Sequence, residues 1–258
     1  MSHNNIWEGA PAKTFEVEPL WNSFIEHAGG MRVNEFLSKS PSLKNADYIF
    51  PDKEIIIELK EIKTQFTDQP GNQSAIDALS KKTIDRLLEV LGEKQEAGQT
   101  PELILNQWRQ QYLRIFRPNL VNICKKANKQ LKQTKAYFDI NSSLGVIVIV
   151  NEEFTGLTPQ NIISLLGNIL ENSYSSIDCC LYVSVNRYVE ILDSDEPKLV
   201  WAPIYSDRAP DLLVEFINWL GEMWFDFLED QAGPFTSRAT TDDMSFLSGA
   251  RSITIPET

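Results

Sequence analysis

Apolar residues recur along the chain with two different spacings, and each spacing predicts one type of element. Two short apolar segments, residues 46–50 and 55–62, enclose a turn-forming Pro51-Asp52-Lys53-Glu54, which predicts two strands joined by a hairpin. Residues 145–150 are a continuous apolar run, typical of a central strand covered on both faces. Further strands are expected at residues 179–192 and 198–205.

The helical spacing predicts helices before, between and after these strands in the sequence. They are expected at residues 19–39, 73–97, 101–116, 119–138, 159–173 and 211–229. Gly29-Gly30 should interrupt the first of them, and Pro118 should separate the helix that ends at residue 116 from the next one. Residues 1–18 show no clear period and are expected to form an arm.

The order of these elements predicts an α/β protein with a mixed central sheet flanked by helices. Residues 1–230 are expected to form a single domain. The helical segment at about residues 64–118 then lies between a strand and the next core helix, as an insertion. Residues 231–258 lose periodicity and are expected to form a C-terminal tail or peripheral segment.

Composition narrows the class of protein. The 258 residues are 42% hydrophobic, enough for a buried core, and no run approaches the roughly 20 apolar residues that span a bilayer. No signal peptide is apparent, and three cysteines with one adjacent pair are a poor disulfide framework, so the cytoplasm is the expected compartment and no membrane is expected. Two histidines leave little room for a histidine-based metal site or a Ser-His-Asp triad.

Charge is distributed unevenly along the chain. The net charge of −12 argues against a protein that coats nucleic acid without specificity. No acidic residue lies between Glu102 and Asp139, however, and that window holds eight lysines and arginines. A local basic face could therefore bind phosphate on an acidic protein. A solvated helix surface is the alternative interpretation of the same stretch.

The second strand of the expected hairpin carries an unusual pair of charges. Alternate side chains of a strand share a face, so Glu58 and Lys60 lie opposite the apolar face of Ile55, Ile57 and Leu59. Burying two opposite charges costs several kcal/mol unless both are well satisfied. A solvated edge would explain the pair without a function, and a catalytic site is the other interpretation.

The expected register of the hairpin favours the catalytic interpretation. If Pro51 to Glu54 form a four-residue loop, Phe50 pairs with Ile55, and Asp47 lies opposite Glu58. Two facing carboxylates repel each other unless a cation lies between them. Oxygen ligands favour Mg²⁺ or Mn²⁺, and the carbonyl of Leu59 would be a third ligand. Lys60 would help position or deprotonate the attacking water and stabilise negative charge on phosphate.

These residues resemble the motif of the PD-(D/E)xK nuclease superfamily, which has the restriction-endonuclease-like fold. The similar segment is residues 45–62, in which Asp47 matches the strand carboxylate, and Glu58 and Lys60 match the motif glutamate and lysine. The resemblance also implies an acidic residue from the first core helix, with Glu35 as the first candidate and Glu26 as the second. Ala46 stands where the motif often has proline.

A second segment resembles the RecB-like branch of that superfamily. Gln133-Thr134-Lys135-Ala136-Tyr137 fits its Gln-x-x-x-Tyr signature, on the core helix that follows the hairpin. At 100° per residue, one arc of this helix is polar and is expected to bind nucleic acid. Its members are Lys126, Lys129, Gln130, Gln133 and Tyr137. A position at the edge of the core is the alternative for Tyr137.

The resemblance implies a Mg²⁺-dependent nuclease that hydrolyses phosphodiester bonds, with DNA as the expected substrate and a role in bacterial restriction, repair or defence. The alternative is a catalytically silent nuclease-like protein that acts through a partner, which the acidic charge and the aromatic helix at 211–229 favour. A phosphoesterase acting on nucleotides is a third hypothesis. A homodimer or a partner protein is compatible with each of them.

Overall fold

The computed structural model describes residues 4–8, 13–36, 45–92, 99–171, 174–191, 194 and 196–254. The chain divides into two compact units. The first comprises residues 1–64 and 123–258, and the second comprises residues 65–122. The second unit therefore begins and ends close to the insertion expected at about residues 64–118.

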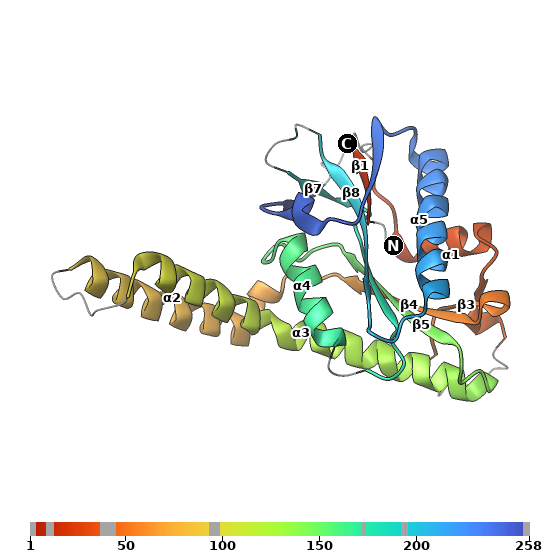
Figure 1. Cartoon of the computed structure of the whole chain (residues 1–258), viewed down its shortest axis with the longest axis horizontal. Helices are drawn as coiled ribbons and strands as arrows, with labels where there is room; N and C mark the ends of the chain where they lie inside the picture. The colour runs from red at the N-terminus through yellow and green to blue at the C-terminus, as the bar shows by residue number, and fades with distance from the viewer. Residues whose placement is uncertain are drawn as a thin grey trace. The chain divides into compact units, whose positions relative to one another are not determined.

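The described part of the first unit contains one mixed sheet of ten strands (Figure 1). The main order is β10-β7-β8-β6-β5-β4-β3-β2, and β1 pairs with β8 and β9. Only the β4–β5 and β5–β6 pairs are parallel. The strands are β1 (Asn4–Glu8), β2 (Met31–Arg32), β3 (Tyr48–Phe50), β4 (Ile55–Ile62), β5 (Leu144–Asn151), β6 (Cys179–Val183), β7 (Arg187–Glu190), β8 (Lys198–Tyr205), β9 (Ser237–Thr241) and β10 (Arg251–Thr254).

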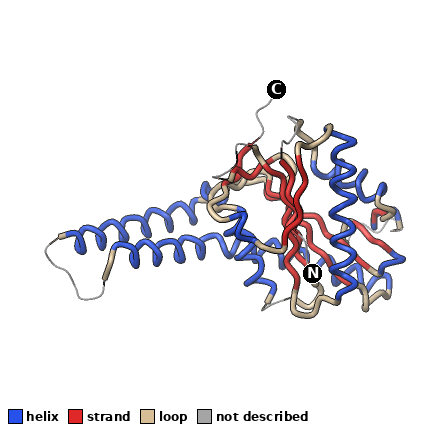
Figure 2. The backbone as a smooth tube through the Cα atoms, turned by 45° about the horizontal axis from the view of Figure 1, so that its top comes forward, coloured by secondary structure: helices blue, strands red, loops and turns tan. Residues whose placement is uncertain are grey.

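Helices cover both faces of this sheet, which confirms the α/β class with a mixed, helix-flanked sheet (Figure 2). Helices α1 (Val17–His27) and α5 (Asp211–Ala232) share one buried cluster with β4, β5 and β6. On the opposite face lie α4 (Pro159–Leu170), which contacts β6 and β8, and the part of α3 (Pro101–Phe138) from residue 123 onward. Short 3-10 turns occur at Val33–Glu35, Pro51–Lys53, Phe66–Asp68 and Met244–Leu247.

Three tryptophans form the centre of the α1–α5 layer. Trp21 and Trp224 stack with ring centroids 4.8 Å apart, and Trp201 of β8 lies 6.3 Å from Trp21. All three are fully buried. The aromatic residues of α5 therefore serve mainly to hold α1 and α5 on the sheet, in the buried cluster that also contains Tyr48 and Phe50 of β3.

The second unit consists of α2 (Pro70–Leu91) and the first part of α3. Arg86 of α2 donates to Gln107 of α3 at 2.9 Å, and Asn119 donates to Gln69 at 2.9 Å. The expected break at Pro118 was wrong, because α3 runs through this proline. Phe116 and Leu120 on either side are fully buried, and this packing outweighs the one helix hydrogen bond that proline cannot make.

Four other boundaries differ from those expected. The helix expected to resume after Gly30 is replaced by β2 and a 3-10 turn up to residue 35, while residues 37–39 lie outside the described part of the chain. The N-terminal arm contains β1, and the strand expected at residues 179–192 is divided into β6 and β7. The expected C-terminal tail supplies β9 and β10 at the periphery of the sheet. Pairing with distant strands stabilises these short segments, and the local periodicity of the sequence gives no indication of such pairing.

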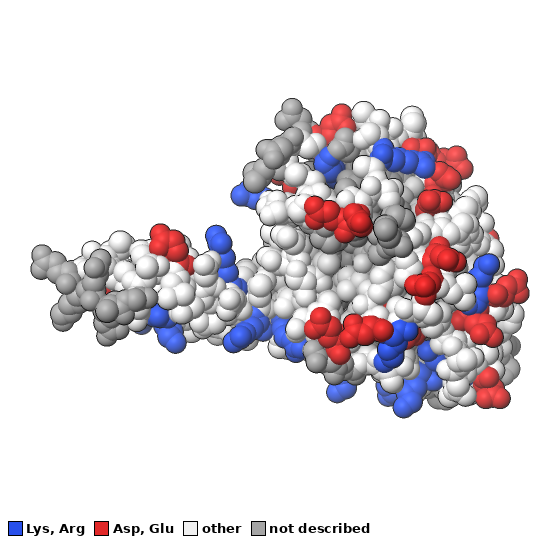
Figure 3. All heavy atoms as spheres, in the orientation of Figure 1, with Lys and Arg blue, Asp and Glu red and all other residues white. Residues whose placement is uncertain are grey.

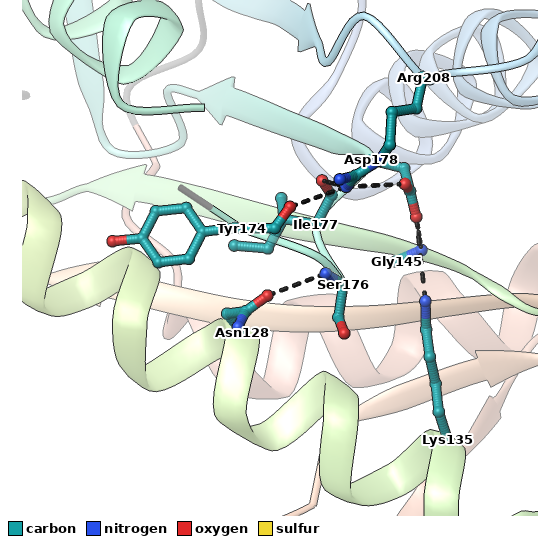
Figure 4. A network of polar contacts seen from close by, with 8 residues as sticks. All are labelled: Asn128, Lys135, Gly145, Tyr174, Ser176, Ile177, Asp178 and Arg208. Atoms are coloured by element: carbon teal, nitrogen blue, oxygen red, sulfur yellow. Dashed lines mark hydrogen bonds and ion pairs between the residues drawn. The ribbon is translucent and has the colours of Figure 1, made fainter. Parts of the chain in front are cut away.

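The parallel strands β5 and β6 begin at a close backbone approach. A Cβ added to Gly145 would lie 1.9 Å from the carbonyl oxygen of Ser176, so only glycine fits there. The N–H of Gly145 donates to Oδ2 of Asp178 at 2.8 Å, and the N–H of Ser176 donates to Oδ1 of Asn128 on α3 at 3.0 Å (Figure 4). These contacts fix one flank of α3 to the start of β5.

In the described part of the chain, no helix has both the length and the apolar character that crossing a membrane requires.

Candidate active site

The β3–β4 hairpin has the register expected from the sequence. Phe50 pairs with Ile55, and Tyr48 pairs with Ile57. The loop turns through Pro51–Lys53 and ends at Glu54, which adopts a left-handed conformation with φ 52°. Asp47 directly precedes the paired residues of β3 and lies at the level of Glu58.

The two faces of β4 also divide as expected. Ile55, Ile57 and Leu59 belong to the buried cluster that contains α1 and α5. Glu58 and Lys60 lie on the opposite face by the alternation of a strand. Glu58 is 0% exposed, whereas the side chain of Lys60 is 23% exposed. The carboxylate is therefore buried, and the amine lies at the margin of the site.

The site residues contact one another directly. The Lys60 ammonium forms an ion pair with Oε1 of Glu58. Oδ2 of Asp47 accepts a hydrogen bond from the N–H of Leu59 at 2.8 Å. The N–H and C=O of one strand residue point toward the same neighbouring strand, so the carbonyl of Leu59 faces the side of Asp47. The structure thus brings together Asp47, Glu58, Leu59 and Lys60.

Burial dominates the electrostatics of the two carboxyls. Burial and, second, the negative charge of Asp47 together raise the pKa of Glu58 to about 8, against the opposing effect of Lys60. Burial also raises the pKa of Asp47, against the hydrogen bond from Leu59 and the charge of Lys60. Both shifts show that one lysine does not compensate two adjacent carboxylates.

One oxygen of this pair lacks a donor. Oε2 of Glu58 is buried and accepts no hydrogen bond when both carboxyls are ionised, because a hydrogen bond between Glu58 and Asp47 requires a proton on one of them. A buried acceptor in that state costs free energy unless a proton, a water molecule or a cation satisfies it. A hard cation held by Asp47, Glu58 and the Leu59 carbonyl would satisfy Oε2 and cancel the repulsion between the carboxylates.

The buried carboxylate of Asp178, by contrast, is satisfied by the protein itself. Both carboxylate oxygens of Asp178 have partners, because Oδ2 accepts from Gly145 and Oδ1 lies 3.3 Å from Arg208 (Figure 4). Arg208 also donates to the carbonyl of Ile177 at 2.9 Å, and Lys135 lies 3.9 Å from Asp178. We interpret this network as structural. The carboxylate of Glu58 differs from that of Asp178 because one of its oxygens is unpaired.

Two carboxylates and a carbonyl make a small ligand set. Among the described residues, no group of three or more His, Cys, Asp and Glu side chains could hold a metal ion. The oxygen donors of Asp47, Glu58 and Leu59 are of the kind that Mg²⁺ takes, with water or substrate oxygens needed to complete its shell.

The two sequence-based candidates for a further acidic residue lie close together. Glu35 and Glu26 both form ion pairs with Arg32, at 2.8 Å and 2.9 Å, on an exposed surface. The acidic residue of α1 whose charge acts on Asp47 is Glu18, and this charge raises the pKa of Asp47. Glu18, in the first turn of α1, was not among the sequence-based candidates.

The polar flank of α3 has a mixed character. Gln130 donates to the carbonyl of Asn45 at 2.9 Å, so it holds the chain that leads to Asp47. Lys126, Lys129 and Tyr137 are exposed, and Oε1 of the half-buried Gln133 has no hydrogen-bond partner. Basic side chains line the lower edge of the view in Figure 3, over the second half of α3. The exposed lysines of that stretch are Lys125, Lys126, Lys129 and Lys132.

Comparison of the chain with protein-family models, with curated proteins and with solved structures found no match.

Proposed function

We propose that this protein is a Mg²⁺- or Mn²⁺-dependent nuclease that hydrolyses phosphodiester bonds of nucleic acid. The observation that carries the proposal is the buried Glu58, whose Oε2 lacks a partner beside a second carboxylate and a lysine. Asp47, Glu58 and the Leu59 carbonyl would hold the cation. When bound, it would polarise the scissile phosphate and neutralise charge that develops there.

We assign to Lys60 the role of a catalytic base or an electrostatic stabiliser. Its ammonium is held by Glu58, and its side chain is 23% exposed at the margin of the buried site. There the ammonium can orient the attacking water and stabilise the negative charge on the phosphate in the transition state, whereas only the neutral amine could take a proton from that water. Glu58 fixes the amine at this margin, whereas an unpaired lysine side chain would sample many rotamers.

The fold is consistent with a restriction-endonuclease-like core. A helix (α1), a hairpin (β3–β4), a second core helix (α3) and a parallel strand (β5) follow one another, and β5 pairs with the strand that carries Glu58 and Lys60. The resemblance of residues 45–62 and 133–137 to the PD-(D/E)xK superfamily and its RecB-like branch supports DNA as the substrate. By the same resemblance, we propose a role in bacterial restriction, repair or defence, in the cytoplasm.

The proposal is tested by incubating purified protein with linear and circular plasmid, single-stranded DNA and RNA, with Mg²⁺, Mn²⁺ or EDTA. We expect cleavage that requires the divalent ion and is lost in Asp47→Asn, which keeps the size of the side chain but removes its charge. A wild-type protein that cuts none of these polymers under any condition would contradict the proposal.

The basic flank of α3 yields a separate prediction. Lys126→Glu should weaken DNA binding about tenfold or more at low salt and reduce the dependence of affinity on salt, because a phosphate contact is replaced by repulsion. Lys132→Glu is the matched control, since it makes the same charge change at a position 120° away around the helix axis. Fluorescence anisotropy at several salt concentrations measures both, and equal losses in the two variants would show that no particular flank of α3 binds DNA.

One observation favours the alternative function, a nuclease-like assembly protein without cutting activity. The second unit exposes large apolar side chains at Ile84, Leu88 and Leu91 of α2, with exposed fractions of 55%, 64% and 72%. Exposed apolar residues at helical spacing are typical of surfaces that contact another protein. Calorimetry with Mg²⁺ and Mn²⁺ separates the two functions, because an assembly protein has no need to bind either ion at Asp47 and Glu58.

A further inference from the structure

The backbone that leads into Asp47 is held by a buried hydroxyl group of α3. Thr134 and Ala46 are 0% and 1% exposed. Oγ1 of Thr134 accepts a hydrogen bond from the N–H of Ala46 at 2.7 Å and donates to the carbonyl of Gln130 at 3.0 Å. Gln130 in turn donates to the carbonyl of Asn45. Two consecutive residues before Asp47 are thus tied to one turn of the helix.

Asp47 lies outside the regular pairing of β3, so these ties matter for its position. Its own N–H donates to the carbonyl of Ile57 at 3.1 Å, and its carbonyl accepts from Val33 at 2.9 Å. The strand β3 begins only at Tyr48. The carboxylate must nevertheless stay beside Leu59 and Glu58, in spite of the repulsion that acts on it when both groups are ionised.

We propose that Thr134 is a positioning residue for Asp47, acting through the N–H of Ala46. This inference rests on the proposed function in taking Asp47 as a cation ligand. It gives the helix that carries the Gln-x-x-x-Tyr segment a second role besides the expected contact with nucleic acid. Groups that orient ligand carboxylates without touching the cation typically change its affinity or the activity by 10–100-fold when they are removed.

Two substitutions separate the contribution of the Thr134 hydroxyl from that of side-chain packing. Thr134→Val keeps the shape but leaves the buried N–H of Ala46 without its acceptor, whereas Thr134→Ser keeps the hydroxyl. Thr83→Val is the matched control, because Thr83 is also a buried helical threonine and its hydroxyl donates only to Leu79 of its own helix, at 2.8 Å.

Hydrogen exchange provides a readout that does not depend on activity. In Thr134→Val we expect the amides of Asp47 and Leu59 to exchange about fivefold to tenfold faster, as for one lost buried hydrogen bond, while the amide of Val148 in β5 keeps its rate. Thr134→Ser and Thr83→Val should exchange like the wild type at all three amides. Equal acceleration at Asp47, Leu59 and Val148 would mean general destabilisation and would overturn the inference.

Calorimetry with Mn²⁺ then tests the functional consequence. We expect Thr134→Val to bind Mn²⁺ about tenfold more weakly or worse. Its kcat for DNA cleavage should fall in proportion at fixed ion concentration, with KM for DNA unchanged. Wild-type affinity in Thr134→Val, or equal losses in Thr134→Ser, would refute the positioning role. A wild-type protein that binds no Mn²⁺ would instead refute the proposed function, and the exchange rates would still decide whether Thr134 holds Asp47.

Discussion

Lys60→Met is expected to slow DNA cleavage by about 10²–10³-fold, the usual loss when one preorganised charge at a reacting centre is removed. Methionine keeps the length and much of the apolar stem of lysine but cannot carry a proton or a positive charge. Because Lys60 is not among the proposed cation ligands, the affinity for Mn²⁺ should change much less than the rate does. Single-turnover cleavage at saturating protein measures the rate, and calorimetry measures the affinity.

Lys63→Met provides the matched control for that prediction. Lys63 lies just beyond β4, its side chain is 66% exposed, and it pairs with Glu61 at 2.9 Å. The substitution removes the same charge from the same end of the strand, so a loss equal to that of Lys60→Met would indicate general electrostatics. Cleavage by Lys60→Met at the wild-type rate would show that Lys60 takes no part in the reaction.

The candidate site follows from sequence because its geometry is local. The spacing from Asp47 to Glu58 and the turn at residues 51–54 determine which side chains face each other, and alternation along a strand separates Ile57 from Glu58. The positions that escaped prediction depend on distant pairing. Glu18 becomes relevant only through the packing of α1 on the sheet, and the role of Thr134 depends on contact with a residue 88 positions earlier in the chain.

The fold was predictable to a similar degree and for the same reason. Long periodic or continuous apolar segments such as residues 145–150 identify their elements, because their own burial stabilises them. Short strands such as β1 and β9 have no such signal, and they exist because each offers hydrogen bonds to a neighbour. Pro118 was misleading for the opposite reason, since the packing of α3 overrides a local preference.

Glu58→Gln should make the protein more stable at pH 8 than the wild type in the absence of divalent ions. The pKa of Glu58 is about 8 in the folded protein and near its ordinary value of 4.5 in the unfolded chain. Between these two pH values the folded state binds more protons than the unfolded state, so the free energy of unfolding falls as pH rises. Each pKa unit corresponds to about 1.4 kcal/mol, which predicts a wild-type deficit of a few kcal/mol at pH 8.

Urea unfolding of both proteins at pH 5 and pH 8 with EDTA measures this difference, and Glu35→Gln is the control. Glu35 belongs to an exposed ion pair with Arg32, so its replacement should change the free energy of unfolding by less than about 1 kcal/mol at either pH. Parallel pH profiles for wild type and Glu58→Gln would mean that Lys60 alone stabilises the ionised carboxylate. Under the proposed function, Mn²⁺ at pH 8 should restore the stability of the wild type but not raise that of Glu58→Gln to the same extent, because a bound cation would take the place of the proton between Asp47 and Glu58.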